Sequence, residues 1–118
     1  MFKTIATTLF LVALSAGTAQ AWERIDTEAA YRAQVVGNRQ VVAGSGHVVV
    51  QPDGTVTGEW NGQPVSGNWS WNDGYYCRSL RIGNTDIGSN CQLIEVEGNQ
   101  IRSTNDRGQG RNVTATLE

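Results

Sequence analysis

The chain has 118 residues, with nine basic and eleven acidic side chains and a formal net charge of −2. This length fits a single domain. Basic residues do not outnumber acidic ones, which argues against nucleic-acid binding, since proteins that bind nucleic acids usually carry a basic patch. Two cysteines and one histidine make a poor ligand set for structural zinc. We therefore expect no metal and no cofactor.

Residues 1–21 have the pattern of a secretory signal peptide. Lys3 gives the positive start, Ile5 to Leu14 is a short apolar run, and Ala19-Gln20-Ala21 fits a small-x-small cleavage site. The run is shorter than the roughly 20 residues that span a bilayer, although a retained N-terminal anchor is the alternative. We expect a mature domain of residues 22–118 that is periplasmic or secreted, does not span the membrane, and carries eight arginines against eleven acidic residues.

One helix is predicted over residues 27–36. Asp26 or Thr27 can cap its N-terminus, and Gly37-Asn38 provides a C-terminal stop. The apolar side chains that recur at helical spacing are Ile25, Ala29, Ala33 and Val36, and Tyr31 and Val35 widen this stripe. We expect the helix to plug or cover a sheet.

The rest of the mature chain has the pattern of short strands separated by turns. Strong turn signals occur at Pro52-Asp53-Gly54, Asn61-Gly62 and Asn72-Asp73-Gly74. The predicted strands are 39–42, 47–51, 55–60, 63–71, 75–82, 90–97, 100–104 and 111–117, with a polar loop over 83–89 and a glycine-rich loop over 105–110. About eight short strands indicate an all-β fold, and successive hairpins favour a small antiparallel up-and-down β-barrel over a sandwich.

The two cysteines, Cys77 and Cys91, are expected to form a disulfide, because an even count in a small exported protein is typical of paired cysteines. The bond would close a loop of about 15 residues and stabilise the fold by roughly 3 kcal/mol. If Leu80 and Ile82 face the core, strand alternation places Cys77 on the outer face.

The same alternation points Arg78 inward or to the rim. An inward guanidinium needs acceptors, so two interpretations stay open. Arg78 either pairs with Glu95 or Asp86 or binds an anion in a cavity.

A group of tryptophans gives the second candidate feature. Trp69 and Trp71 share one strand face with Gly67, and Trp60 can pack across the intervening turn. One cluster of three rings would either fill the core or line a pocket for a hydrophobic or ring-bearing ligand. The candidate ligand-binding residues are Trp60, Trp69, Trp71, Tyr76 and Arg78.

No catalytic set is recognisable. His47, the single histidine, has no nucleophile and orienting acid paired with it, and Gly44-Ser45-Gly46 lacks the frame of a nucleophile elbow. We predict a non-enzymatic barrel that binds a small hydrophobic or anionic ligand or an envelope protein. A protease inhibitor or another protein-binding module is the alternative, and an enzyme is less favoured.

Several motifs carry a family resemblance: Trp22 to Asp26, Asp53 to Gly58, Gly67 to Arg78, Cys91-Gln92 and Asp106 to Gly110. With them the chain resembles short exported bacterial proteins that share a GxWxWxDGYYCR…CQ pattern. Some of these are labelled dihydrodipicolinate reductase, but a nicotinamide-dependent reductase needs a strand, a glycine-rich loop and a helix that this sequence lacks.

A weaker similarity links the chain to periplasmic metalloprotease inhibitors and to lipocalin-like barrels. Its basis is the G-x-W strand together with, for the inhibitors, the length and the single disulfide. It implies a small barrel. Such inhibitors act through an extended N-terminal segment, whereas Trp22 to Arg24 here lead directly into the predicted helix.

Overall fold

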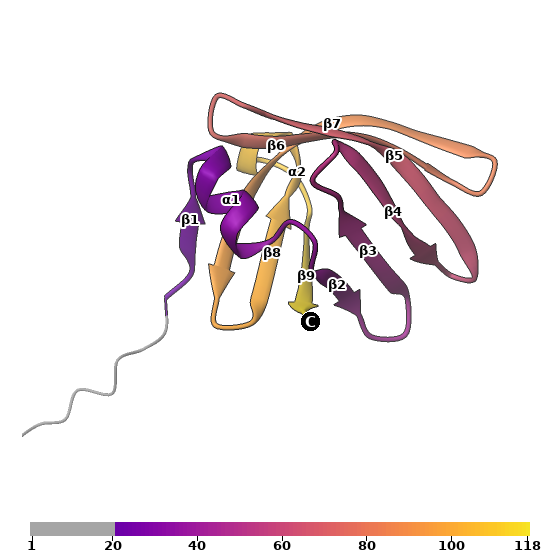
Figure 1. Cartoon of the computed structure of the whole chain (residues 1–118), viewed down its shortest axis with the longest axis horizontal. Coiled ribbons are helices and arrows are strands. Elements are labelled where there is room, and N and C mark those ends of the chain that lie inside the picture. Colours follow the sequence, from indigo (N-terminus) through magenta and orange to yellow (C-terminus); the bar gives the residue numbers. More distant parts are fainter. Residues whose placement is uncertain (1–20) are drawn as a thin grey trace, which may run out of the picture.

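Eight strands join edge to edge into a closed antiparallel barrel in the computed structural model, which describes residues 21–118 (Figure 1). They are β2 (Arg39–Val42), β3 (Gly46–Val50), β4 (Thr55–Trp60), β5 (Gln63–Asn72), β6 (Tyr75–Ile82), β7 (Thr85–Glu97), β8 (Gln100–Thr104) and β9 (Asn112–Leu117). A further strand, β1 (Glu23–Ile25), and two short helices, α1 (Glu28–Gln34) and α2 (Asn105–Gly108), complete the fold. The predicted small all-β barrel with an N-terminal helix is confirmed. The expected signal peptide falls almost wholly outside the described residues.

Two of the hairpins have the tight turns that the sequence predicts. Asn61 and Gly62 have φ values of 48° and 78°, and Asp73 and Gly74 have φ values of 52° and 87°. Two successive residues with positive φ are the mark of a type I′ turn, whose twist matches that of the flanking strands. The β4–β5 and β5–β6 hairpins therefore form where they were expected.

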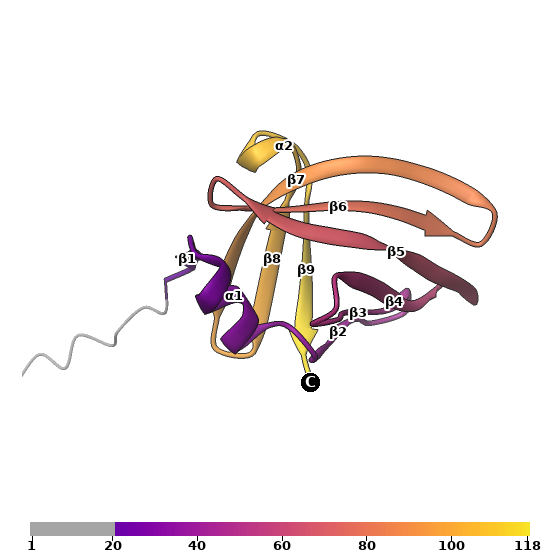
Figure 2. The same ribbon diagram turned by 45° about the horizontal axis from the view of Figure 1, so that its top comes forward.

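The long strand β7 closes the barrel. Its first part pairs with β6, from Ile82↔Thr85 to Tyr76↔Gln92, and its last part pairs with β8. As a result β8 and β9 run steeply across the direction of β6 and the first half of β7 (Figure 2). The ring is completed by β9 beside β2, where the backbones of Arg39 and Glu118 exchange hydrogen bonds of 3.1 and 2.9 Å.

The predicted polar loop over residues 83–89 is wrong, because β7 begins at Thr85 and only Gly83 and Asn84 form the turn. The side chains from Thr85 to Ser89 are exposed, so this arm lacks the apolar alternation by which a strand is recognised. The β6–β7 register shifts between Leu80↔Gly88 and Arg81↔Asp86. Ile87 is the extra residue of this bulge.

The N-terminal segment departs from expectation in two ways. β1 pairs with β7 beyond the start of β6, and three residues with one apolar side chain gave no strand signal. The helix spans Glu28–Gln34 with Thr27 as its N-cap, and it buries Tyr31 and Val35 while Ala29 and Ala33 are exposed. The predicted apolar stripe is therefore wrong at Ala29 and Ala33, while Ile25 is buried and Val36 packs against the core. In so short a helix one i, i+4 pair of large side chains, Tyr31 and Val35, supplies the buried contact.

Alternate side chains of β5 and β6 face the barrel interior, as the strand alternation in the sequence predicts. Val65, Trp69 and Tyr76 are buried core residues, and the Cys77–Cys91 disulfide joins directly opposite residues of β6 and β7. The disulfide lies on the outer face of the barrel, as strand alternation predicts. Among residues 21–118, no helix is both long enough and apolar enough to cross a membrane.

Candidate functional site

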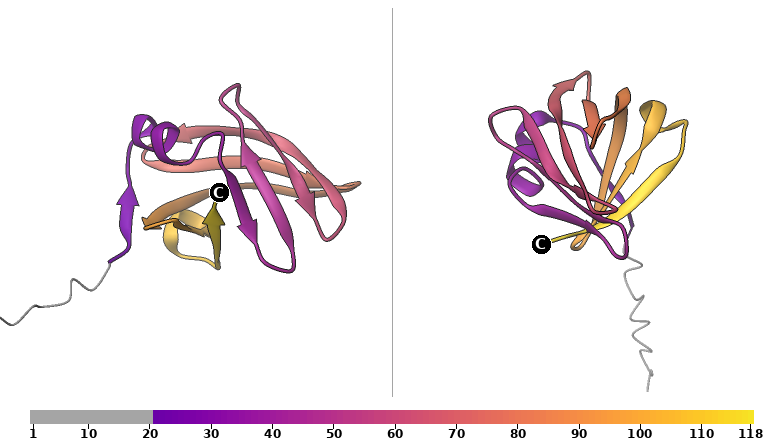
Figure 3. Two further views of the ribbon diagram at one scale, coloured as in Figure 1. Left: turned by 60° about the horizontal axis from the view of Figure 1, so that its bottom comes forward. Right: turned by 90° about the vertical axis from the view of Figure 1, so that its right-hand side faces the viewer.

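The barrel holds a cavity of about 200 Å³ on the side away from α1. Figure 3 shows α1 at one end of the molecule and the tip of the β6–β7 hairpin at the other. Apolar side chains form most of the wall: Val42, Val48, Val56, Trp60, Val65, Leu80, Ile82, Ile87, Val113 and Ala115. The polar contribution comes from Gln40, Tyr76, Arg78, Gln92 and Ser103.

The mouth of this cavity is apolar and open to solvent. Ile87 and Val113, which are 42% and 50% exposed, are the large hydrophobic residues that the described part of the chain leaves exposed. Both line the cavity. A shallow depression of about 280 Å³ shares Trp60, Ile82 and Ile87 with it, so the two spaces adjoin at this end.

The inward residues of β6 lie at successive depths along the cavity wall. Tyr76, Arg78, Leu80 and Ile82 all line it and alternate along one strand. Alternate residues of an antiparallel strand are about 7 Å apart, so the backbone of Arg78 lies one such step deeper than that of Leu80. Its guanidinium, however, reaches the carbonyl of Gly88, the residue opposite Leu80, so the charged group lies level with Leu80. Tyr76 lies deeper still, next to the aromatic core.

Arg78 has no carboxylate partner among residues 21–118. The salt bridges in this part of the chain are Arg32–Glu28 and Arg102–Glu95, the latter at 3.0 Å. The interpretation in which Arg78 pairs with Glu95 or Asp86 is therefore wrong. Glu95 is held by Arg102, and Asp86, which lies opposite Arg81, accepts from the Gly88 amide at 2.8 Å.

The guanidinium of Arg78 makes one hydrogen bond, from Nη1 to the Gly88 carbonyl at 3.3 Å. Burial lowers the pKa of Arg78 from its ordinary value, and the nearby Tyr76 acts in the opposite direction. Burial also raises the pKa of Tyr76. Both shifts have the same cause, because protein atoms surround part of the Arg78 guanidinium and most of the Tyr76 hydroxyl.

Two other polar side chains on the wall are already engaged. Gln92 donates from Nε2 to Asn105 Oδ1 at 2.6 Å, and Gln40 forms a side-chain hydrogen bond with Tyr31. Arg78, with five N–H donors and a hydrogen bond from one of them, brings the largest set of donors to the cavity.

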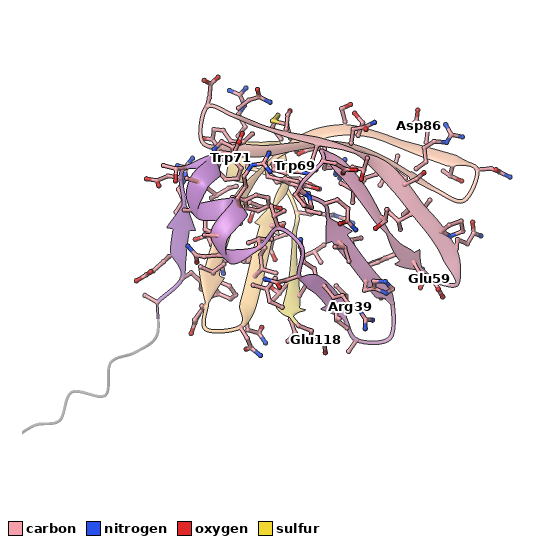
Figure 4. The ribbon with its side chains drawn as sticks, viewed as in Figure 1. Arg39, Glu59, Trp69, Trp71, Asp86 and Glu118 are labelled. Carbon is pink, nitrogen blue, oxygen red and sulfur yellow. A yellow bond between two sulfur atoms is a disulfide. The ribbon has the colours of Figure 1, made fainter. Side chains whose placement is uncertain are left out.

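Trp69 and Trp71 lie at the closed end of the barrel. Figure 4 shows both beside α1. Tyr31 from this helix packs against Trp69 with ring centroids 5.6 Å apart and against Trp71 at 5.0 Å. The Trp69 indole donates to the Gln51 carbonyl at 2.7 Å, and neither tryptophan lines the cavity. These two rings form an aromatic cluster with Tyr31 and Tyr76, and of the four only Tyr76 lines the cavity.

Trp60 is separate from those rings, so the expected single cluster of three tryptophans is wrong. It pairs with Gln63 at the β4–β5 turn, while Trp69 lies six residues farther along β5. Its neighbour Glu59 is at the far end of the molecule from Trp69 in Figure 4. The antiparallel register carries the two strands' tryptophans to opposite ends. Of the candidate residues, Trp60, Tyr76 and Arg78 line the cavity.

The sequence pattern missed Ile87 at the mouth. This residue fell in the expected polar loop, and the only signal for it was one isolated isoleucine among polar neighbours. Val113 lies in the strand that the sequence predicts over residues 111–117, and it lines the cavity even though half of it is exposed.

His47 lies opposite Glu59 on the neighbouring strand and is not part of the cavity wall. Within residues 21–118, no three His, Cys, Asp or Glu side chains gather in a way that would hold a metal ion.

No family model matches this sequence, and searches of curated proteins and of solved structures found no match either. The interpretation of the cavity accordingly rests on its own geometry.

Proposed function

We propose that this chain is an exported, non-enzymatic binding protein that holds one small, largely apolar molecule inside its barrel. The observation that carries the proposal is the cavity whose mouth is formed by Ile87 and Val113. Exposed apolar side chains at the rim of an apolar cavity are typical of ligand entry sites.

The cavity limits the size of the molecule. About 200 Å³ corresponds to six or seven water molecules at roughly 30 Å³ each. A single ring or a short chain fits this space, and a longer molecule would extend past Trp60 into the adjoining depression. Larger drug-sized ligands need pockets of about 300–1,000 Å³.

A small ligand is favoured over an envelope protein as the occupant. The exposed large apolar residues, Ile87 and Val113, border the cavity and do not form a separate flat patch. The inhibitor alternative depends on a free extended N-terminus, whereas Glu23–Ile25 is paired with β7. Neither alternative has a specific observation in its favour.

Export is supported by the sequence of residues 1–21 and by the Cys77–Cys91 disulfide. Disulfides persist in oxidising compartments such as the bacterial periplasm. A periplasmic location is therefore part of the proposal.

Octanamide, a neutral chain with a polar end, is a suitable probe. Titration into protein with labelled methyl groups should shift the signals of Val48, Val65 and Leu80, which line the cavity. Ala115→Leu should abolish these shifts because it adds bulk to the cavity wall, whereas its outward neighbour Thr114→Leu should leave them unchanged. Absence of binding to the wild-type protein, or equal binding to both variants, would overturn the proposal.

A further inference from the structure

The cavity combines apolar walls with a single cationic group. Arg78 lies between Tyr76 and Leu80 on the inward face of β6 and is only partly exposed. It forms no salt bridge with a carboxylate of residues 21–118, and Asp106, which borders a surface depression together with Arg78, bonds Asn90 instead. A guanidinium has five N–H donors, and a single bond to the Gly88 carbonyl leaves most of them available.

We propose that the ligand is an amphipathic anion, such as a small carboxylate, bound with its charged group on Arg78 and its apolar part against Leu80 and Ile82. This inference rests on the proposed function and specifies the chemistry of its ligand. It assigns Arg78 as the ligand's counter-ion and the principal determinant of specificity.

The order of residues along β6 sets the orientation. The guanidinium of Arg78 lies level with Leu80, because it bonds the carbonyl of the opposite residue Gly88, and Ile82 lies farther out at the mouth. A carboxylate that reaches Arg78 thus leaves its apolar part in contact with the outer wall. The opposite orientation would bury a hydrocarbon against the guanidinium and leave the charged group among exposed apolar side chains.

Charge balance explains why an anion is favoured over a neutral polar molecule. Removing a cation from water without a partner is costly, and a bound carboxylate offsets this cost with charge-assisted, bidentate hydrogen bonds. The planar fork of arginine suits a carboxylate better than the point charge of lysine does. The neighbouring amides and hydroxyls of the wall cannot replace a negative charge.

The test compares octanoate with octanamide, which have the same chain and differ in charge. Octanoate should bind the wild-type protein on the order of tenfold to a hundredfold more tightly, as measured by calorimetry or methyl shifts. Arg78→Met should bring the two affinities together, and Arg78→Lys should retain part of the difference. Arg81→Met is the matched control, because Arg81 is exposed on the outer face of the same strand and donates to the Asn84 carbonyl.

The outcomes separate this inference from the proposed function. Equal binding of octanoate and octanamide to the wild-type protein would contradict the proposal that the ligand is an anion, and would leave the cavity proposal intact. Failure of both probes removes both proposals. If Arg78→Met does not fold, the Nε–H signal of Arg78 in labelled wild-type protein decides. It should move with octanoate and not with octanamide, and an unmoved signal at saturating octanoate contradicts the assignment.

Discussion

The indole Nε1–H of Trp69 on β5 donates a 2.7 Å hydrogen bond to the backbone carbonyl of Gln51, in the segment between β3 and β4. The same ring is only 7% exposed and lies edge-on to Tyr31 of α1. One side chain therefore ties together the sheet, the turn at Pro52-Asp53-Gly54 and the helix that covers the closed end of the barrel.

Trp69→Phe should lower the free energy of unfolding by about 1–3 kcal/mol, because it removes the shorter of the two hydrogen bonds to the Gln51 carbonyl, leaving the Gly54 amide at 3.2 Å, and reduces packing against Tyr31. Urea denaturation measures this loss. Trp71→Phe is the matched control, since Trp71 is partly exposed and packs against the same Tyr31. An equal loss in both variants would show that ring volume, and not the hydrogen bond, is what matters.

Gly67 marks a place where two strands approach closely. A Cβ at this position would collide with the Ser79 carbonyl and lie 2.7 Å from Leu80 Cδ2. Gly67→Ala should therefore destabilise the fold by about 1–3 kcal/mol, the usual range for overpacking. Ser66→Ala, on the exposed face of the same strand, should change the stability by less than about 0.5 kcal/mol. Thermal or urea unfolding of a Gly67→Ala variant as stable as the wild type would contradict this reading.

Strand alternation and turn chemistry were enough to predict most of the barrel. They are local properties, and so the positions of Asp73-Gly74 and Cys77 follow from neighbours in sequence, whereas alternation alone left Arg78 either inward or at the rim. The relation between Trp60 and Trp69 depends instead on the register of two strands and on which end of the barrel each ring reaches.

The mouth of the cavity was harder to predict for a similar reason. Ile87 belongs to an exposed arm of β7, where the bulge and not an apolar pattern sets its direction. β1 is also stabilised by tertiary contact, because Ile25 is 2% exposed while Glu23 and Arg24 are exposed. Short segments of this kind are defined by what they pack against, which a single sequence does not display.

The mature protein should begin at Trp22. This ring lies under the guanidinium of Arg102, 4.4 Å from ring centroid to Cζ, and Arg102 also binds Glu95. Cleavage after Ala21 would thus leave the contact between Trp22 and Arg102 intact. Intact mass and N-terminal sequencing of protein recovered from the periplasm should give residues 22–118 with an oxidised cysteine pair, and a full-length membrane-bound chain would contradict the export proposal.

Loss of the disulfide should destabilise the barrel without changing its topology. Cys77 and Cys91 are 14 residues apart in sequence, and a loop of this length corresponds to roughly 3 kcal/mol of chain entropy. The double variant Cys77→Ser/Cys91→Ser should lose about 3 kcal/mol of its free energy of unfolding, measured by urea denaturation. It should keep its β-sheet circular dichroism. Reduction of the wild-type protein should reproduce the shift, and the reductant should have no effect on the double variant.

The stability of the barrel should fall in alkaline solution because Tyr76 is buried. Burial raises the pKa of Tyr76, with Arg78 opposing the shift, and burial raises the pKa of Tyr31 as well. As the pH rises above about 10, the unfolded chain releases these protons before the folded chain does. The stabilising contribution is therefore complete below that pH and is lost as the pH rises toward the folded-state pKa, by up to about 1.4 kcal/mol per pH unit and group. Tyr76→Phe should flatten this decline in urea unfolding between pH 9 and about 11. A slope identical to that of the wild type would show that the Tyr76 hydroxyl titrates alike in both states.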